Sequence, residues 1–369
     1  MTAYAWLDQR TQRAGERLAQ APAHQRAEAN KYTRYTALKD RAQASFEWGT
    51  KDAELLSVEA AVAQHPERMQ AVLGGLATGA WADASLASAH GVVVVHLAES
   101  GEPVRLSLSG LGQGFSAPRL VVLTEPQVER RLELELLDDT DDHHLNLVIE
   151  ADLAPESRLD LNLLQAQRLS GLTTTTSAVR VGRGATFNGT WLDSGSRIAR
   201  HDVQVDLTER GAATRIAGLM LPGAGQHHDH HVHVRHGASE THSDQLFKGL
   251  VGRKGRSVFS GCVEVCEGAQ GCSADQLSRG LLLGEGAEFD ARPQLLISYD
   301  AVEASHGSSC GAMDEDALFF LRSRGLSQSD ARLLMAQAFA GEVHELVATS
   351  DWVERSQAAL AQRLEGLDG

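Results

Sequence analysis

The stretch VQVDLTERGAATRIAG (residues 203–218) contains the pattern that decides the fold. Val203, Val205 and Leu207 alternate with polar residues, which places their side chains on one face of a β-strand. A charged turn containing Gly211 follows, and then the apolar residues begin again. A one-sided strand, a turn and an apolar restart are expected of coils that stack in a solenoid.

The same unit recurs along the middle of the chain at irregular intervals. It appears as GRGATFNG (182–189), GRKGRSVFSG (252–261), CEGAQGCSAD (266–275) and GEGAEFDARP (284–293). Earlier alternating runs are Val104, Leu106, Leu108; Leu132, Leu134, Leu136; and Leu159, Leu161, Leu163. We predict a mainly β chain with a right-handed parallel β-helix, and a β-sandwich or jelly roll is the alternative. No long helices alternate with the strands, which excludes doubly wound and TIM-barrel folds.

Helical patterns flank this region on both sides. At the N-terminus, apolar residues recur at helical spacing among polar ones, and an Ala/Leu/Val-rich run over 53–64 stops at His65-Pro66. At the C-terminus, acidic residues precede ALFFLRSRG (317–325), whose last turn is basic and which ends in Gly. Ser327 then precedes the second of three helices. We therefore expect an N-terminal helical domain (1–90), a β-helix core (91–311) and a C-terminal helical domain (312–369).

Composition and charge exclude several classes of partner. The chain has 369 residues and a formal net charge of −15, which argues against binding to nucleic acid or to anionic membranes. It has no export signal and no run of about 20 apolar residues, so we expect a cytoplasmic protein. Its four cysteines are too few for a disulfide framework and are expected to be thiols.

Common catalytic motifs are missing. The sequence has no GxxxxGK[ST] and no GxGxxG between a strand and a helix, so the chain is not expected to hydrolyse ATP. GxSxG and HExxH are missing too. Aromatic residues make up only 5% of the chain, which weighs against a carbohydrate-active β-helix enzyme that would need aromatic platforms.

The run HHDHHVHVRH (227–236) suggests a metal site. On a strand, His231 and His233 would face one way and His228, His230 and His236 the other. A stand-alone β-helix or cupin-like metalloenzyme that uses His231 and His233 is therefore the alternative function. The simpler interpretation is a polar, exposed strand face, because metal sites usually gather ligands from several elements.

His306 is the strongest single candidate for a functional residue. It lies in EASHGSSCG (303–311), which we interpret as a Ser/Gly loop between the β region and the helical tail. Such a loop can present a ring nitrogen to a partner or an ion. Cys310 follows four residues later and is expected to fill space at a turn. Cys262 and Cys266 would lie ~13 Å apart on one strand, too far for a shared ion.

A series of short motifs over about a hundred residues resembles the SufB/SufD family of iron–sulfur cluster assembly proteins, and in particular its SufD-like members. The motifs include His236 and Ser243 with LFKG (246–249), VFSG (258–261), RPQL (292–295), SHG (305–307), LFFLRSRGL (318–326) and AFAGEV (338–343). Upstream, AEANKYTRYTAL (27–38) is similar to the N-terminal segment of the family.

The resemblance implies a scaffold that is not itself an enzyme. SufD-like proteins pair through the β-helix with a homologous SufB subunit, and their C-terminal helices bind the ABC-type ATPase SufC. It implies that His306 lies near the SufB interface and takes part in assembling a nascent iron–sulfur cluster, with no cofactor bound permanently to this chain alone. Phe319, Arg322, Arg324 and Phe339 would belong to the surface that meets the ATPase. A homodimer of the isolated chain is also plausible, since a free sheet edge can pair with itself.

Overall fold

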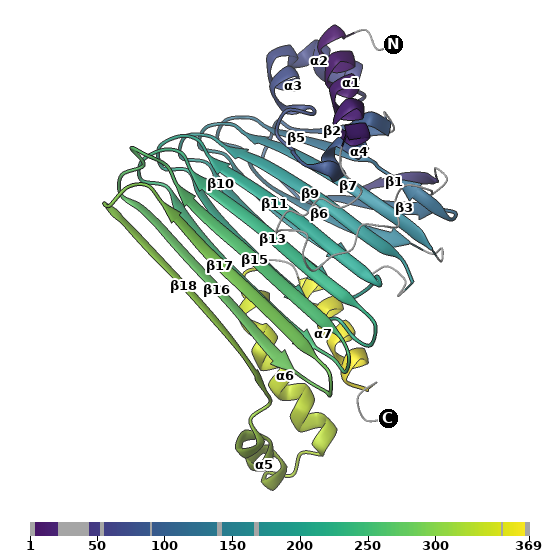
Figure 1. Ribbon diagram of the computed structural model, residues 1–369, viewed down its shortest axis with the longest axis vertical. Coiled ribbons are helices and arrows are strands. Elements are labelled where there is room, and N and C mark those ends of the chain that lie inside the picture. Colours follow the sequence, from purple (N-terminus) through teal and green to yellow (C-terminus); the bar gives the residue numbers. More distant parts are fainter. Residues whose placement is uncertain are drawn as a thin grey trace.

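A computed structural model describes residues 4–20, 44–51, 55–88, 91–138, 142–165, 170–347 and 350–365. This part of the chain folds into a parallel β-solenoid, with helices before and after it in the sequence (Figure 1). The predicted fold class is confirmed, and the parallel pairing of successive coils excludes the β-sandwich or jelly roll.

Two facing sheets form the solenoid. The first has the strand order β1-β3-β6-β8-β10-β12-β14-β16-β18, and the second has the order β17-β15-β13-β11-β9-β7-β5-β2, with β4 beside β7. The first sheet consists of Ser45–Lys51 (β1), Val104–Leu111 (β3), Glu129–Asp138 (β6), Arg158–Gln165 (β8), Thr186–Asp193 (β10), Ala213–Met220 (β12), His242–Val251 (β14), Cys272–Leu282 (β16) and Val302–Ala312 (β18). The second consists of Val92–Leu97 (β2), Gly114–Ser116 (β4), Arg119–Thr124 (β5), His143–Leu153 (β7), Leu172–Val181 (β9), Ile198–Leu207 (β11), His227–His236 (β13), Arg256–Val265 (β15) and Glu288–Ile297 (β17).

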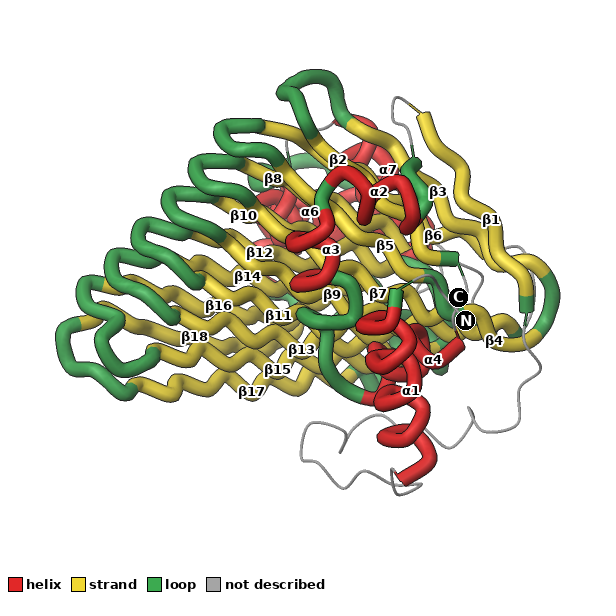
Figure 2. The backbone as a smooth tube through the Cα atoms, turned by 90° about the horizontal axis from the view of Figure 1, so that it is seen from above, coloured by secondary structure: helices red, strands yellow, loops and turns green. Residues whose placement is uncertain are grey.

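The core between the sheets is a set of side-chain ladders. The register aligns Leu134, Leu163, Trp191, Gly218 and Phe247 on successive coils, and the four side chains of this row are buried. A Cβ atom at Gly218 would lie 2.5 Å from the Phe247 ring, so glycine makes room for the aromatic side chain. Loops that join the two sheets follow one another along one side of the solenoid, from β8 to β18 (Figure 2).

The recurring turns predicted from the sequence lie where the chain passes from one sheet to the other. Gly184 and Gly211 take positive φ angles of 63° and 74° in the turns before β10 and β12. This left-handed conformation is accessible to glycine at little cost. The Gly-Ala units of the sequence are therefore the corners of the coils.

The N-terminal part is helical with one exception. Its helices are Ala5–Gln20 (α1), Val58–Gln64 (α2), Pro66–Val72 (α3) and Ala80–Ser88 (α4), and α2 to α4 contact β2, β7 and β9 of the second sheet. The expectation of helices alone was wrong for β1, which pairs antiparallel with β3. Pro66 ends α2 as predicted, and it also begins α3, where its missing N–H costs nothing. The family-like segment 27–38 lies outside the described residues.

Three helices follow the solenoid, as predicted: Glu315–Ser323 (α5), Gln328–His344 (α6) and Ser350–Glu365 (α7). Asp314 and Ser327 accept hydrogen bonds from the first backbone N–H groups of α5 and α6 and so cap these helices. Helix α6 packs against β12 and β14 of the first sheet. None of the helices in the described ranges combines the length and apolar character needed to cross a membrane.

Candidate functional site

His306 lies on a strand at the end of the solenoid. We expected a loop here, but residues 302–312 form β18 and pair with β16. The Ser/Gly composition was misleading, because ladder hydrogen bonds to a neighbouring strand can override weak intrinsic strand propensity. His306 is consequently held on a regular element.

The register shows which way His306 faces. It pairs with Gln276 of β16, and Gln276 is buried between the two sheets. Paired residues of neighbouring strands point to the same side of a sheet. The imidazole of His306 therefore points into the space between β18 and β17. It is still exposed, because no further coil follows it in the described part of the chain.

The last coil is open on its outer side. Strands β17 and β18 end their sheets, so each has one edge without a strand partner among the described residues. Leu296 and Ile297 at the end of β17 are 54% and 44% exposed. The first coil differs, because β1 pairs with the outer edge of β3 and Leu56 forms a bridge to Val94 of β2. An open edge with exposed apolar side chains is suited to pairing with another chain.

Cys310 shares this face of β18 with His306. Four strand residues separate them by ~13 Å, so the two cannot hold the same ion. Cys310 is exposed at the open end rather than packed in a turn, which corrects our expectation. Partial burial and the Asp290 carboxylate raise the pKa of its thiol. Among the thiols described, Cys262, Cys266 and Cys272 lie on or beside earlier coils.

Helix α5 presents a mixed aromatic and basic surface. Phe319 and Phe320 are 72% and 55% exposed, and Arg322 and Arg324 are exposed beside them. The Arg324 guanidinium lies 5.1 Å from the centre of the Phe320 ring. Figure 1 shows α5 beyond the end of β18, away from the sheets.

Phe339 occupies a different position. It is half-buried on α6, where its ring lies 4.7 Å from Nζ of Lys248. Lys248 Nζ donates to the main-chain carbonyl of Phe339 at 2.6 Å and contacts Glu342 at 3.1 Å. Phe339 thus lies at the contact between α6 and β14, apart from the exposed residues of α5.

The histidine run forms β13, and its two faces differ as predicted. His228, His230 and His236 are completely buried, while His231 and His233 are partly exposed. The interpretation of the run as an exposed polar face was wrong for the inner half. These imidazoles are accommodated because each has a polar partner inside the solenoid, such as the carbonyl of Gly195 at 2.8 Å from His228 Nε2.

Two of the inner rings share one carboxylate. Asp193 Oδ2 lies 2.5 Å from His230 Nε2, and its Oδ1 lies 2.8 Å from His201 Nε2. The two rings stack with centroids 4.7 Å apart. Burial alone would raise the pKa of Asp193, but the two histidines outweigh it and hold this pKa well below its usual range. Sequence reasoning missed this cluster because its residues come from three coils.

The outer half of β13 lines a groove. His231 and His233 border a hollow of about 300 Å³ together with Cys262 and Arg292 on the outer face of the second sheet. His231 Nε2 lies 2.9 Å from Asp229, and His233 Nε2 lies 3.1 Å from Glu264. Neither belongs to a group of three potential ligand residues in the described part of the chain.

Comparison with known proteins agrees with the resemblance seen in the sequence. The chain is 34% identical over 172 residues to the iron–sulfur cluster assembly protein SufD of Escherichia coli, an alignment that covers 47% of this chain and 41% of that protein. It is 34% identical over 168 residues to a SufBD family protein of Synechocystis, covering 46% and 37%. It is 29% identical over 233 residues to the chloroplastic protein ABCI7 of Arabidopsis thaliana, covering 62% and 49%.

The chain spans less than half the length of these curated relatives. A family model matches a similarly long part of the chain. The model of the SufBD core domain of the SUF system for FeS cluster assembly matches residues 107–339, which is more than half of the chain and includes all strands from β4 to β18. By this match and by its parallel solenoid, the chain belongs to the SufB/SufD family.

Proposed function

We propose that this chain is a scaffold subunit of an iron–sulfur cluster assembly complex and is not itself an enzyme. In this proposal it pairs with a SufB-like subunit through the last coil and binds a SufC-like ABC ATPase through its C-terminal helices. The observation that carries the proposal is the open coil formed by β17 and β18, which has His306 between its strands.

The asymmetry of the two ends supports pairing. Long exposed strand edges promote uncontrolled association, and proteins usually cover them or place charged residues on them. The first coil is covered by β1 and by the bridge from Leu56. Strand β18 has neither lysine nor arginine in its sequence VEASHGSSCGA. A homologous solenoid that adds its own terminal strands would satisfy both edges and bury Leu296 and Ile297.

The ligands that an iron–sulfur cluster needs imply that the partner subunit supplies most of them. A cluster generally needs about four protein ligands, mostly cysteine thiolates. The open coil offers the imidazole of His306 and one thiol, that of Cys310, whose pKa is raised. Most ligands of a nascent cluster must therefore come from the SufB-like subunit, with His306 contributing an imidazole at the seam.

The C-terminal helices offer a surface for the ATPase. Exposed aromatic residues beside arginines are enriched among residues that dominate protein interfaces. Phe319, Phe320, Arg322 and Arg324 form such a surface on α5. Phe339 lies apart from this surface, on α6. Its contact with Lys248 links α6 to β14 of the solenoid. In this proposal, movement of the ATPase is transmitted through this link to β14 and from there, through β16, to β18 of the last coil.

Coexpression of the chain with SufB-like and SufC-like subunits of the same genome tests the proposal. We expect a complex of the three, in which His306→Ala lowers the yield of assembled cluster without dissolving the complex. His233→Ala is the matched control, because this imidazole is also partly exposed but lies on the outer face of β13. Failure of the three chains to copurify would contradict the scaffold role, and normal cluster yield with His306→Ala would remove that residue from the mechanism.

A further inference from the structure

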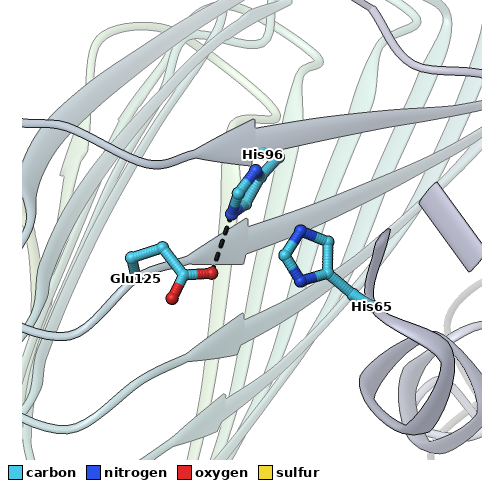
Figure 3. A group of neighbouring side chains, drawn as sticks. All are labelled: His65, His96 and Glu125. Atoms are coloured by element: carbon cyan, nitrogen blue, oxygen red, sulfur yellow. Dashed lines mark hydrogen bonds and ion pairs between the residues drawn. The ribbon is translucent and has the colours of Figure 1, made fainter. Parts of the chain in front are cut away.

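Three potential metal ligands meet where the N-terminal helices contact the first coil. His65 lies between α2 and α3, His96 lies on β2, and Glu125 directly follows β5. His96 Nε2 is 2.8 Å from Glu125 Oε1, and the rings of His65 and His96 have centroids 4.2 Å apart. One ligand atom from each residue lies within 4.8 Å of the other two. Figure 3 shows the ring of His65 directed toward the pair formed by His96 and Glu125.

Within the described ranges, one ring nitrogen of His65 has no hydrogen-bond partner. Nε2 of His65 is buried and makes no hydrogen bond to any residue that the structure describes. Buried polar atoms are normally paired, so an unpaired ring nitrogen needs an explanation. A cation between the three side chains would supply a partner for His65 and would be shared with His96 and Glu125.

The donor set selects the class of ion. Two imidazoles and a carboxylate suit Zn²⁺ and related first-row transition metals, whereas Ca²⁺ and Mg²⁺ prefer oxygen ligands throughout. Metal–ligand bonds of about 2.0–2.2 Å place neighbouring ligand atoms roughly 3.3 Å apart in a tetrahedral site. The present spacing requires only small side-chain movements to reach this arrangement. Burial and the neighbouring His96 lower the pKa of His65, which is consistent with a neutral ring.

Arg68 brings a positive charge next to Glu125 but does not block the site. Its Nε and Nη2 donate to the side chain and main chain of Asp152 at 2.8 and 2.9 Å. Its contact with Glu125 Oε1 is longer, at 3.3 Å. The guanidinium is therefore held mainly by Asp152, and Glu125 can bind a cation by giving up only the weaker contact.

We propose that His65, His96 and Glu125 bind a divalent transition-metal ion of the Zn²⁺ type, which joins helices α2 and α3 to the first coil of the solenoid. The three ligands come from three elements, as expected of a metal site, and leave a fourth position for water or another ligand. The site lies at the opposite end of the solenoid from His306, and it does not depend on the proposed scaffold role.

The second group of potential ligands, Asp193 with His201 and His230, is a weaker candidate. Both oxygens of Asp193 already have an imidazole partner within 2.8 Å, and all three side chains are completely buried. Asp193 Oδ1, His201 Nε2 and His230 Nδ1 also make no hydrogen bond to a described residue, so unpaired atoms do not separate the two groups. Burial does, because His65, His96 and Glu125 are each only partly buried and an ion can reach them from solvent.

Zn²⁺ titration of the full-length chain tests the proposal. The protein should be prepared without a histidine tag, stripped with a chelator and titrated by calorimetry, and Co²⁺ absorption should report the ligand number independently. We expect one Zn²⁺ per chain, with affinity reduced at least about tenfold in His65→Asn and in Glu125→Gln. His233→Asn, on the histidine-rich strand, should bind as tightly as the wild type.

Thermal unfolding provides a second measurement. Zn²⁺ should raise the Tm of the wild type and of His233→Asn, because a ligand that binds only the folded state stabilises it. It should leave the Tm of His65→Asn and Glu125→Gln nearly unchanged, with circular dichroism showing that both variants are folded. The proposal is overturned if the wild type shows no saturable Zn²⁺ binding, or if His65→Asn and Glu125→Gln bind Zn²⁺ as the wild type does.

Discussion

Lys248 of β14 and Phe339 of α6 are joined by a hydrogen bond of 2.6 Å from the lysine Nζ to the main-chain carbonyl. The same ammonium lies 4.7 Å from the centre of the Phe339 ring, and the lysine side chain is only 1% exposed. Burial lowers the pKa of Lys248, although Glu342 partly offsets this effect. Two family motifs, LFKG and AFAGEV, thus meet at one contact between the solenoid and the C-terminal helices.

Removing this ammonium should loosen the helices from the solenoid. Lys248→Met keeps the length of the side chain but removes the ammonium that donates to the Phe339 carbonyl and contacts Glu342. We expect a loss of about 1–3 kcal/mol in the free energy of unfolding, measured by urea denaturation. Hydrogen exchange should rise over residues 328–344 more than over the central strands. Lys254→Met, at an exposed turn, should change neither quantity, and equal behaviour of the two variants would refute the link.

A charge on the open edge should prevent pairing. Lysine on an edge strand opposes the addition of another strand, so Leu296→Lys and Ile297→Lys should abolish copurification with the SufB-like subunit. Both residues are about half exposed, so the free energy of unfolding should change by less than about 0.5 kcal/mol. Self-association of the isolated chain, measured by analytical ultracentrifugation, should be lost with the same substitutions.

Leu111→Lys is the control for the edge experiment. Leu111 is 45% exposed but lies on β3, at the other end of the solenoid. The variant should copurify normally. Equal loss of pairing in Leu111→Lys, or retained pairing in both edge variants, would show that the last coil is not the contact surface.

The aromatic surface of α5 should be needed for the ATPase but not for folding. Changing Phe319 and Phe320 together to Ser should weaken binding of the SufC-like subunit at least tenfold, or about 1.4 kcal/mol, in a titration of purified chains. The Tm should hardly change, because both rings are more than half exposed. Unaltered binding by this variant would exclude α5 as the docking surface, and Leu111→Ser should bind normally in any case.

The fold could be predicted from the sequence because the solenoid repeats a local signal. Alternating residues such as Leu132 and Leu134 indicate one-sided strands, and Gly-Ala turns mark the corners between them. The same argument failed at β18, where small residues gave no strand signal. Strand β1 lies on β3 through pairing with residues more than fifty positions away, which no local pattern reveals.

The polar interior was harder to predict than the fold. Glu150 alternates like an exposed residue, yet it is completely buried because α3 and α4 cover the outer face of β7. Its partners are Arg119, on another coil, and backbone N–H groups of residues 74, 76 and 77. His65 likewise gave no signal, since its neighbours His96 and Glu125 are about thirty and sixty residues away in the sequence.

The buried pair of Arg119 and Glu150 should be essential for stability. Arg119 Nη1 lies 2.6 Å from Glu150 Oε2, and the two side chains are 1% and 0% exposed. Arg119→Met removes one charge and leaves the other buried, so we expect a loss of about 3–5 kcal/mol in the free energy of unfolding. Arg105→Met is the matched control, because Arg105 pairs with Glu133 on the surface and should cost no more than about 1 kcal/mol. If Arg119→Met and Arg105→Met lose similar amounts of unfolding free energy in urea denaturation, burial is not what makes the Arg119–Glu150 pair important.

His236 should make the stability of the solenoid depend on pH. Burial, together with the nearby His242, lowers its pKa to about 4, and its two ring nitrogens each lie 2.8 Å from a hydroxyl, that of Thr241 or Ser243. An unfolded histidine takes up its proton near pH 6.5, so between about pH 6.5 and 4 the unfolded state binds more protons than the folded state. The contribution of His236 to stability is therefore complete above about pH 6.5 and decreases as the pH falls to 4, by up to roughly 3 kcal/mol.

His236→Gln should flatten that decrease in urea denaturation series at several pH values, whereas His233→Gln, with a ring that is 43% exposed, should retain it. If the His236→Gln and wild-type curves stay parallel from pH 7 to 4, another group is responsible for the acid sensitivity.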